Sequence, residues 1–472
     1  MNLPEKEYNI SKINMGTFGK DFVWGTATSA YQIEGGYNEN GKGPSIWDAF
    51  CTIPGKIKNG DTGNIACDHF NRFKDDIKLL KDLGVNSYRL SLSWSRIMPE
   101  GKNKVNEDGI NFYNDIIDEL LKNDITPWVT LYHWDLPLAL QLEDDGWLGE
   151  SIINNFVTYA DVCFKRFGDR VKNWITLNEP WVVAILGHGH GVFAPGRVSE
   201  VEPYRAAHNL LLAHAHTVDH YRNNYSSQNG NIGITNNCDW REPLTESQSD
   251  IEASQRALEF FLGWFADPVY FGDYPQVMKD RIGNKLPDFT PEQKKLLKGS
   301  SDFFGLNHYT TMYAANKNGT EDKTDVHGNG GISEDQDVSL SVDDRWKLTK
   351  MNWAVVPWGC KKLLHWISDR YDNPDIYITE NGCAFDDKVV EGQIDDSDRV
   401  EYFSTYLAAC EEAIKEGVNL KGYFAWSFLD NFEWNSGYSK RFGIYYVDFE
   451  TLERIPKSSA KWFKKFLSGQ IS

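Results

Sequence analysis

The strongest constraint on the fold of this chain is the alternation of short apolar, strand-like runs with helix-like segments along almost its whole length. We predict strands at residues 22–25, 87–93, 126–132, 174–177, 231–235, 303–306, 376–379 and 422–426. We predict helices at 69–83, 110–122, 152–167, 203–221, 251–265, 356–370, 398–415 and 458–467, and a smaller one from Pro291. Strand–helix units repeated in this way predict an α/β fold, a (β/α)8 barrel.

A doubly wound parallel sheet is the main alternative, but no Gly-x-Gly-x-x-Gly fingerprint follows any of the strands. No internal repeat or linker is found, so residues 1–472 are predicted to form a single TIM-barrel domain whose long loops make the active-site rim. Residues 1–15 are expected to form a poorly ordered or extended N-terminal arm. We expect an ordered lid at 35–68, and a mobile polar loop at 316–343.

The net charge and the tryptophan content indicate which kinds of binding partner or substrate suit this chain. The formal net charge is −19 and Lys and Arg do not cluster, which argues against a nucleic acid or an anionic membrane as partner. The 17 Trp are more informative, because an indole ring can stack on the C–H face of a sugar. A small neutral sugar is therefore a reasonable substrate class.

Seven Cys are scattered singly, without a Cys-x-x-Cys pair or a Cys/His cluster. This pattern signals neither a disulfide framework nor a zinc site, and we expect no metal and no cofactor. The first 16 residues carry no apolar run of the signal-peptide kind, and no stretch is apolar enough to span a membrane. A cytoplasmic location is therefore expected.

Two carboxylates follow predicted strands in the same way. The run 376–379 leads into Glu380 and then into Asn-Gly, and the run 174–177 leads into Asn178, Glu179 and Pro180. A single Glu of this kind is more often an exposed strand end. In a parallel barrel, however, the C-terminal ends of all strands meet at the face where chemistry occurs. We therefore expect the two carboxylates to share one site.

Other polar and aromatic side chains lie within or just after the predicted strands: Gln32, Arg89, His133, Trp134, Asn307, Tyr309 and Trp426. Each alone could be a packing or ion-pairing residue. Together, without metal-ligand spacing or a phosphate cradle, they suit hydrolysis of a neutral polyhydroxylated substrate. Glycoside hydrolysis needs one carboxyl group to protonate the leaving oxygen and another to attack or stabilise the sugar carbon.

The sequence resembles glycoside hydrolase family 1, a β-glucosidase-type family. The motifs that carry the resemblance occur in the family's order at Phe22–Gly25, Ala27–Gly35, Arg89–Arg96, Leu131–Pro137, Thr176–Pro180, Asn307–Tyr309, Ile378–Gly382 and Trp426–Trp434. The resemblance implies a retaining (β/α)8 hydrolase. Glu380 then corresponds to the nucleophile and Glu179 to the acid/base, with carboxyl groups about 5–5.5 Å apart. Arg89 and Tyr309 would keep Glu380 charged and oriented.

The resemblance also implies how the sugar is held. Asn178 would contact the 2-OH, and Gln32, His133 and Trp434 would bind near the 3-OH. Gln32 and Glu433 would bind the 4-OH, and Glu433 the 6-OH as well, while Trp426 would stack on the ring. Trp134, Asn307, Tyr309 and Phe442 are assigned to the same shell.

Two residues discriminate within the family. Glu179 favours an O-glycosidase over a thioglucosidase, and Glu433 would repel a sugar phosphate. Gluco, galacto and fuco epimers all remain possible. On the aglycone side we assign Trp181, Leu186 and Trp353, although Ala354 stands where the family often has Glu.

The sequence thus predicts a retaining exo-β-glucosidase that acts on cello-oligosaccharides or small β-glucosides. Two alternatives stay open. A non-enzymatic glycan-binding barrel would bind sugars without hydrolysing them, although both carboxylates are present here. An enzyme in which transglycosylation dominates would differ in how well its aglycone site holds an acceptor sugar.

Overall fold

A computed structural model describes residues 13–317, 332–390 and 392–470. Its centre is a closed barrel of eight strands in which every neighbouring pair is parallel. In chain order they are β1 (Val23–Ala27), β2 (Ser87–Ser91), β3 (Thr126–Tyr132), β4 (Asn173–Asn178), β5 (Asn231–Asn237), β7 (Phe304–Asn307), β10 (Ile376–Asn381) and β13 (Leu420–Trp426). All eight predicted strands are found, and the predicted barrel is confirmed.

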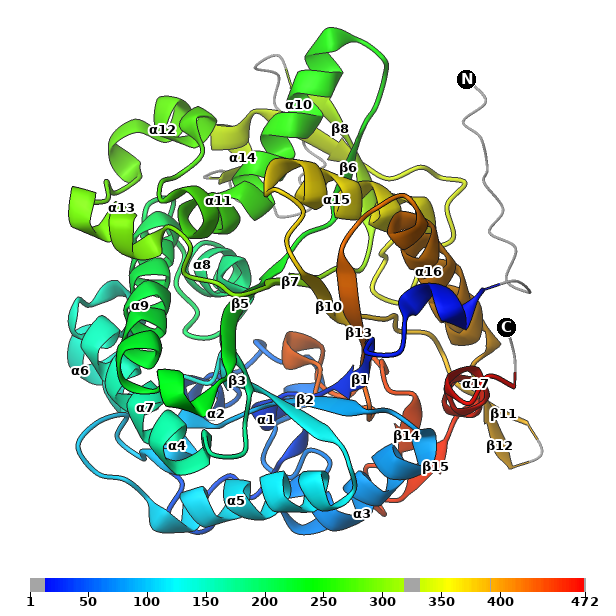
Figure 1. The fold of residues 1–472 in the computed structure, drawn as a ribbon. Coiled ribbons are helices and arrows are strands. Elements are labelled where there is room, and N and C mark those ends of the chain that lie inside the picture. Colours follow the sequence, from blue (N-terminus) through cyan, green and yellow to red (C-terminus); the bar gives the residue numbers. More distant parts are fainter. Residues whose placement is uncertain (1–12, 318–331, 391, 471–472) are drawn as a thin grey trace.

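Helices surround the barrel as an outer layer (Figure 1). The main ones are α3 (His69–Leu83), α5 (Glu107–Lys122), α7 (Ser151–Phe167), α9 (Glu202–Asn224), α10 (Gln248–Leu258), α11 (Trp264–Phe271), α15 (Pro357–Arg370), α16 (Ser397–Lys415) and α17 (Ser458–Leu467). The helix predicted at 251–265 is not continuous α-helix. A π-helical turn at Glu259–Gly263 separates α10 from α11 and carries consecutive buried apolar side chains.

Aromatic side chains fill the lower half of the barrel. The Trp128 ring lies 4.6 Å from that of Tyr377, 5.4 Å from that of Phe424 and 5.5 Å from that of Phe303. Trp128, Tyr377 and Phe424 come from β3, β10 and β13, Phe303 directly precedes β7, and the four form one cluster. Since the barrel is closed by side chains at this level, a substrate has room only at the C-terminal ends of the strands.

Three small sheets lie outside the barrel and were not predicted. Strands β6 (Trp240–Pro243), β8 (Thr311–Asn316) and β9 (Val338–Ser341) form one of them, β11 (Lys388–Val390) and β12 (Gln393–Asp395) the second, and β14 (Tyr445–Val447) and β15 (Arg454–Pro456) the third. The loop predicted at 316–343 lies partly outside the described residues. Its described part contains α14 (Ile332–Gln336) and β9.

The segment at 35–68 is ordered, as predicted. It contains α2 (Ile46–Phe50), which begins with a capping box between Ser45 and Asp48. Trp47 on this helix is fully buried, with its ring 4.6 Å from the ring of Trp434. The lid therefore packs directly on the loop that follows β13.

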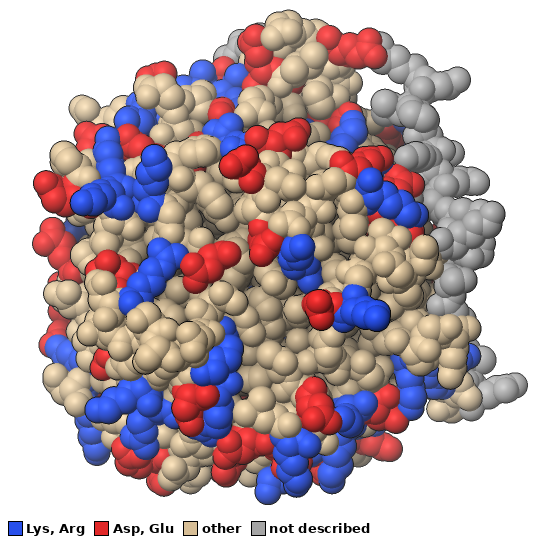
Figure 2. Space-filling model, viewed as in Figure 1, with Lys and Arg blue, Asp and Glu red and all other residues tan. Residues whose placement is uncertain are grey.

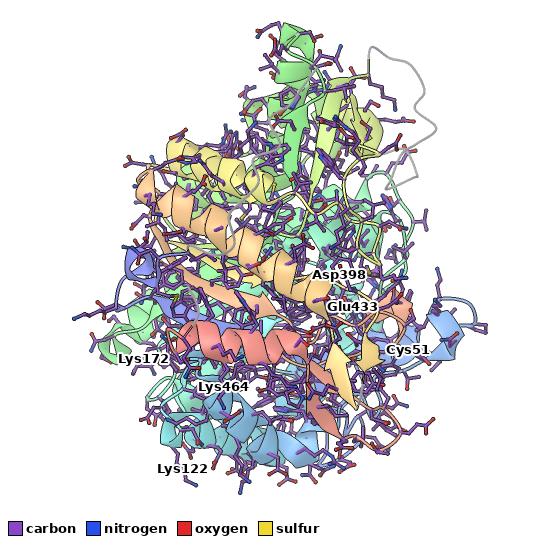
Figure 3. The ribbon with its side chains drawn as sticks, turned by 90° about the vertical axis from the view of Figure 1, so that its right-hand side faces the viewer. Cys51, Lys122, Lys172, Asp398, Glu433 and Lys464 are labelled. Atoms are coloured by element: carbon purple, nitrogen blue, oxygen red, sulfur yellow. The ribbon has the colours of Figure 1, made fainter. Side chains whose placement is uncertain are left out.

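The two ends of the barrel are seen from the side in Figure 3. Lys172, which precedes β4, is labelled at the left, and Cys51 of the lid and Glu433 are labelled towards the right. On the face shown in Figure 2, acidic and basic side chains are interspersed. In the described residues, no helix combines the length and the apolar character needed to cross a membrane.

Candidate active site

Glu380, near the end of β10, is held by two donors. Arg89 Nη1, from β2, donates to Glu380 Oε1 at 2.6 Å, and the Tyr309 hydroxyl donates to Oε2 at 2.6 Å. Glu380 is 4% exposed and Arg89 is fully buried. Both carboxylate oxygens are thus engaged by short, charge-stabilising contacts.

The Asn-Gly pair after Glu380 has a local structural reason. The Asn381 side chain donates to the His308 carbonyl and to the Tyr402 hydroxyl, which ties the strand end to its surroundings. A Cβ at Gly382 would collide with the Trp426 carbonyl oxygen. Only glycine fits there, and the turn that follows Glu380 is fixed by this close approach.

Glu179 lies between β4 and α8 (Pro180–His188), where the chain turns sharply. Its φ is 47°, a left-handed conformation that is uncommon for Glu and directs the chain from strand to helix. Asn307 Nδ2 donates to Glu179 Oε1 at 2.6 Å, and Glu179 is 7% exposed. This hydrogen-bond partner is a neutral amide, in contrast to the Arg89 partner of Glu380.

A hydrogen-bonded network connects the two carboxylates. Asn178 Oδ1 accepts from Arg89 Nη2 at 2.7 Å and from Asn307 Nδ2 at 3.0 Å. Arg89 reaches Glu380 and Asn307 reaches Glu179, so Asn178 lies between the two donors. The network fixes both carboxylates relative to each other from four strands, β2, β4, β7 and β10.

Two threonines support this network and were not predicted. Thr235 Oγ1 donates to Thr379 Oγ1 at 3.1 Å, and Thr379 Oγ1 donates to Asn307 Oδ1 at 2.7 Å. Asn307 therefore presents its amide nitrogen, and not its oxygen, to Glu179. Threonine is an ordinary strand residue, and the only sequence signal was the position of Thr379 directly before Glu380.

The environments separate the two acids. Burial, and then the charge of Glu380, raise the pKa of Glu179 well above its usual range. Burial also raises the pKa of Glu380, but the Arg89 charge and the Tyr309 hydrogen bond oppose this rise. Glu179 is thus the group that keeps its proton, and Glu380 the group that ionises first.

Polar groups and aromatic rings lie beside the two acids. Gln32 Nε2 donates to the Phe432 carbonyl at 2.9 Å and to Glu433 Oε2 at 3.4 Å. Burial, reinforced by the charge of Glu380, raises the pKa of Glu433 to about 8. The structure therefore brings the predicted Gln32 and Glu433 together.

His133 lies between two predicted sugar-binding tryptophans. Its ring is roughly parallel to those of Trp426 and Trp434, at centroid distances of 6.0 and 6.1 Å. Asn178 Nδ2 donates to His133 Nε2 at 3.1 Å. Burial and the Arg89 charge keep the pKa of His133 well below its usual value, so the ring is neutral.

Trp134, which we assign to the sugar-binding shell, lies against Asn178 and Trp434. Its indole N–H donates to the Asn178 carbonyl at 2.8 Å, so this donor is already used. Its ring lies 4.6 Å from that of Trp434. The geometry indicates that Trp134 supports Asn178 and Trp434.

The remaining predicted residues form two groups. The rings of Tyr309, Trp353 and Phe442 lie 5.2 to 6.2 Å from one another. Trp181, on the first turn of α8, has its ring 4.6 Å from that of Phe261, whereas Leu186 lies further along α8 and packs against the core. In the part of the chain that the structure describes, no group of His, Cys, Asp or Glu could hold a metal ion.

The sequence pattern of glycosyl hydrolase family 1 matches residues 14–470. β-Glucosidase 42 of Arabidopsis thaliana is 49% identical over 463 residues, which cover 96% of this chain and 94% of the relative. A rice β-glucosidase, solved as a mutant in a covalent complex with Glc from GA4GE, superposes with a TM-score of 0.91 at 43% identity and covers 95% of this chain and 98% of its own. A Thermotoga maritima β-glucosidase in complex with galacto-hydroximolactam gives a TM-score of 0.88 at 45% identity, with 96% and 99% covered.

These likenesses span nearly the full length of the chain, and the relatives are β-glucosidases. They agree with the (β/α)8 barrel described above. The chain belongs to glycosyl hydrolase family 1 and is a glycoside hydrolase of the β-glucosidase type.

Proposed function

We propose that the chain is a retaining, exo-acting β-glucosidase in which Glu380 is the nucleophile. Attack on the anomeric carbon requires an ionised carboxylate with its free lone pair turned to the sugar. Arg89 and Tyr309 stabilise this form at 2.6 Å on each oxygen. A covalent glucosyl–Glu380 ester would form while the leaving group departs.

Glu179 is the acid/base partner in this proposal. In the first step it donates a proton to the glycosidic oxygen, and in the second it takes a proton from the water that cleaves the ester. Its raised pKa supports the first role. Once Glu380 is esterified, its negative charge is lost, so the pKa of Glu179 falls and the residue can act as a base.

The glycone would be a terminal glucosyl residue. Gln32, His133 and Glu433 offer hydrogen bonds to its hydroxyls, Asn178 lies between the two carboxylates for the 2-OH, and Trp426 offers an apolar face. The Thermotoga relative is described in complex with a galacto-configured inhibitor. Galactosyl and fucosyl substrates are therefore part of the proposal, with cello-oligosaccharides and small β-glucosides as the glucosyl donors.

The proposal depends on the different hydrogen-bond partners of the two carboxylates. Glu380 accepts from a cation, Arg89, and from a phenol, Tyr309, whereas Glu179 accepts from the amide of Asn307. It is tested by removing each carboxylate in turn and supplying azide with 2,4-dinitrophenyl β-glucoside. Glu380→Gly should yield α-glucosyl azide, because azide then attacks directly. Glu179→Gly should yield β-glucosyl azide, because azide then attacks the glucosyl–Glu380 ester.

Azide products of the opposite configuration would mean that the two roles are exchanged. If both variants retained full hydrolysis without azide, neither residue would be catalytic. The substrate range is tested separately with nitrophenyl β-glucoside, β-galactoside, β-fucoside, thioglucoside and 6-phosphoglucoside, of which the first three should be hydrolysed.

A further inference from the structure

The loop that follows β13 is closed at its neck by the side chain of Asp430. Asp430 Oδ2 accepts from Arg441 Nη1 at 2.6 Å, and Oδ1 accepts from the Gly443 N–H at 2.9 Å. The chain between these anchor points carries two of the predicted sugar-binding residues, Glu433 and Trp434. One carboxylate therefore ties the start of this loop to its end.

Asp430 is fully buried and belongs to a network of paired charges. Lys457 Nζ, also fully buried, lies 2.7 Å from Asp430 Oδ1 and 2.9 Å from Asp387 Oδ2. Arg399 Nη1 lies 3.3 Å from Asp387 Oδ1 and 2.6 Å from Asp396 Oδ2. With the arginine of the loop neck, three cations face three carboxylates. Charges buried this deeply need partners, so the network permits only an arrangement in which they stay paired.

The network also joins the loop to the segment that follows the proposed nucleophile. Arg399 Nη2 donates to the Arg441 carbonyl at 2.7 Å, and its Nε donates to the Cys383 carbonyl at 3.2 Å. Cys383 comes three residues after Glu380, and Arg441 directly precedes Phe442 of the predicted sugar-binding shell. The loop is thus held in a fixed position relative to the strand that carries Glu380.

The position of the Glu433 carboxylate depends on this loop. Its contact with Gln32 Nε2 is long, at 3.4 Å. The neighbouring Phe432 donates its N–H to the Gln32 carbonyl at 3.1 Å and accepts from Gln32 Nε2 at 2.9 Å, which fixes the loop on the side of α1 (Ala30–Ile33). Asp430, two residues before Phe432, fixes it on the opposite side, towards Lys457 and α17.

We propose that Asp430 and Lys457 are positioning residues that set the Glu433 carboxylate for recognition of the 4-OH and 6-OH of the glycone. This inference rests on the proposed function, since it requires that these hydroxyls bind Glu433. Both side chains are fully buried, so they act through the loop and do not touch the sugar. Their loss should therefore affect most the substrates that use Glu433.

The test compares p-nitrophenyl β-glucoside with p-nitrophenyl β-xyloside, which has the same leaving group but lacks the hydroxymethyl group at C5. Asp430→Asn keeps the size of the side chain and removes its charge. We expect kcat/KM for the glucoside to fall about tenfold or more, the loss typical of a hydrogen bond to a charged group, with a much smaller fall for the xyloside. Lys457→Met should lower the ratio of glucoside to xyloside in the same direction.

A milder variant keeps the test decisive if these buried changes prevent folding. The Arg441 side chain is 23% exposed, so Arg441→Gln opens the neck of the loop without leaving a fully buried cavity. It should also lower the ratio, and Arg441→Lys, which keeps the charge, should restore part of it. In a Glu433→Gln background, Asp430→Asn should lower the ratio no further, because the proposed effect passes through Glu433.

Asp267→Asn is the matched control. Asp267 is a buried carboxylate that accepts from Arg370 Nη2 and from the Tyr371 hydroxyl, both at 2.7 Å, among the outer helices. Its replacement should leave the ratio of the two substrates unchanged. An unchanged ratio in Asp430→Asn and Arg441→Gln, or a further fall in the Glu433→Gln background, would overturn the positioning role and leave the proposed function intact. If the unmodified enzyme hydrolysed neither substrate, the proposed function itself would fail.

Discussion

Replacing Tyr309 by Phe isolates one hydrogen bond to the proposed nucleophile. The Tyr309 hydroxyl donates to Glu380 Oε2 at 2.6 Å, and burial holds the pKa of the phenol well above its usual value, so it stays a donor. The ring packs against Trp353 and Phe442, contacts that Phe keeps. A hydrogen bond to a charged group contributes about 1.5–3 kcal/mol. Since one pKa unit is about 1.4 kcal/mol, its loss should raise the pKa of Glu380 by about one to two units.

The assay is the pH dependence of kcat/KM for p-nitrophenyl β-glucoside. Only ionised Glu380 attacks, and a raised pKa means that the proton is bound at higher pH. The acid limb should therefore move up by about one to two units in Tyr309→Phe. Tyr313→Phe is the control, because this hydroxyl binds Asp343 outside the site at 3.3 Å. An acid limb that stays in place in a correctly folded Tyr309→Phe would refute the electrostatic role of this tyrosine.

Three further variants test other parts of the site. Glu179→Gln should abolish the basic limb of the pH profile of kcat. It should also slow the hydrolysis of hexyl β-glucoside far more than that of 2,4-dinitrophenyl β-glucoside, because only the hexanol leaving group needs a proton. Equal slowing of both substrates would argue against an acid role. Thr379→Val should lower kcat/KM about tenfold, the equivalent of one lost hydrogen bond, because Asn307 Oδ1 loses its donor. Unchanged kinetics would show that Asn307 needs no such support. Gly382→Ala should lower the free energy of unfolding, measured by urea titration, by about 1–3 kcal/mol, because the added Cβ clashes with the Trp426 carbonyl. An unaltered urea midpoint would contradict the close approach of residue 382 to this carbonyl.

The barrel could be predicted because its strands are short apolar runs that differ clearly from their flanks. The small outer sheets could not, since β11 and β14 are only three residues long and gain their order from neighbouring elements. The short elements α14 and β9 within 316–343 could not be predicted for the same reason. Polar composition alone does not reveal that β9 pairs with β8.

The proposed catalytic pair could be identified from the sequence because each Glu ends a recognisable strand motif. The residues that hold these two carboxylates in place could only partly be predicted. Arg89 and Tyr309 were expected beside Glu380, and the structure places them there. The Thr235–Thr379 pair was missed because its function depends on which strands are neighbours across the barrel, which one strand's sequence does not show.

The central claim is that Glu380 forms a covalent bond with the sugar. The most direct test is to inactivate the enzyme with 2-deoxy-2-fluoro-β-glucosyl fluoride, whose fluorine at C2 slows hydrolysis of the ester, and to locate the label by mass spectrometry of peptides. We predict one fluoroglucosyl group per chain, attached to Glu380. A label on Glu179 or on another carboxylate, or turnover without any trapped ester, would contradict the account.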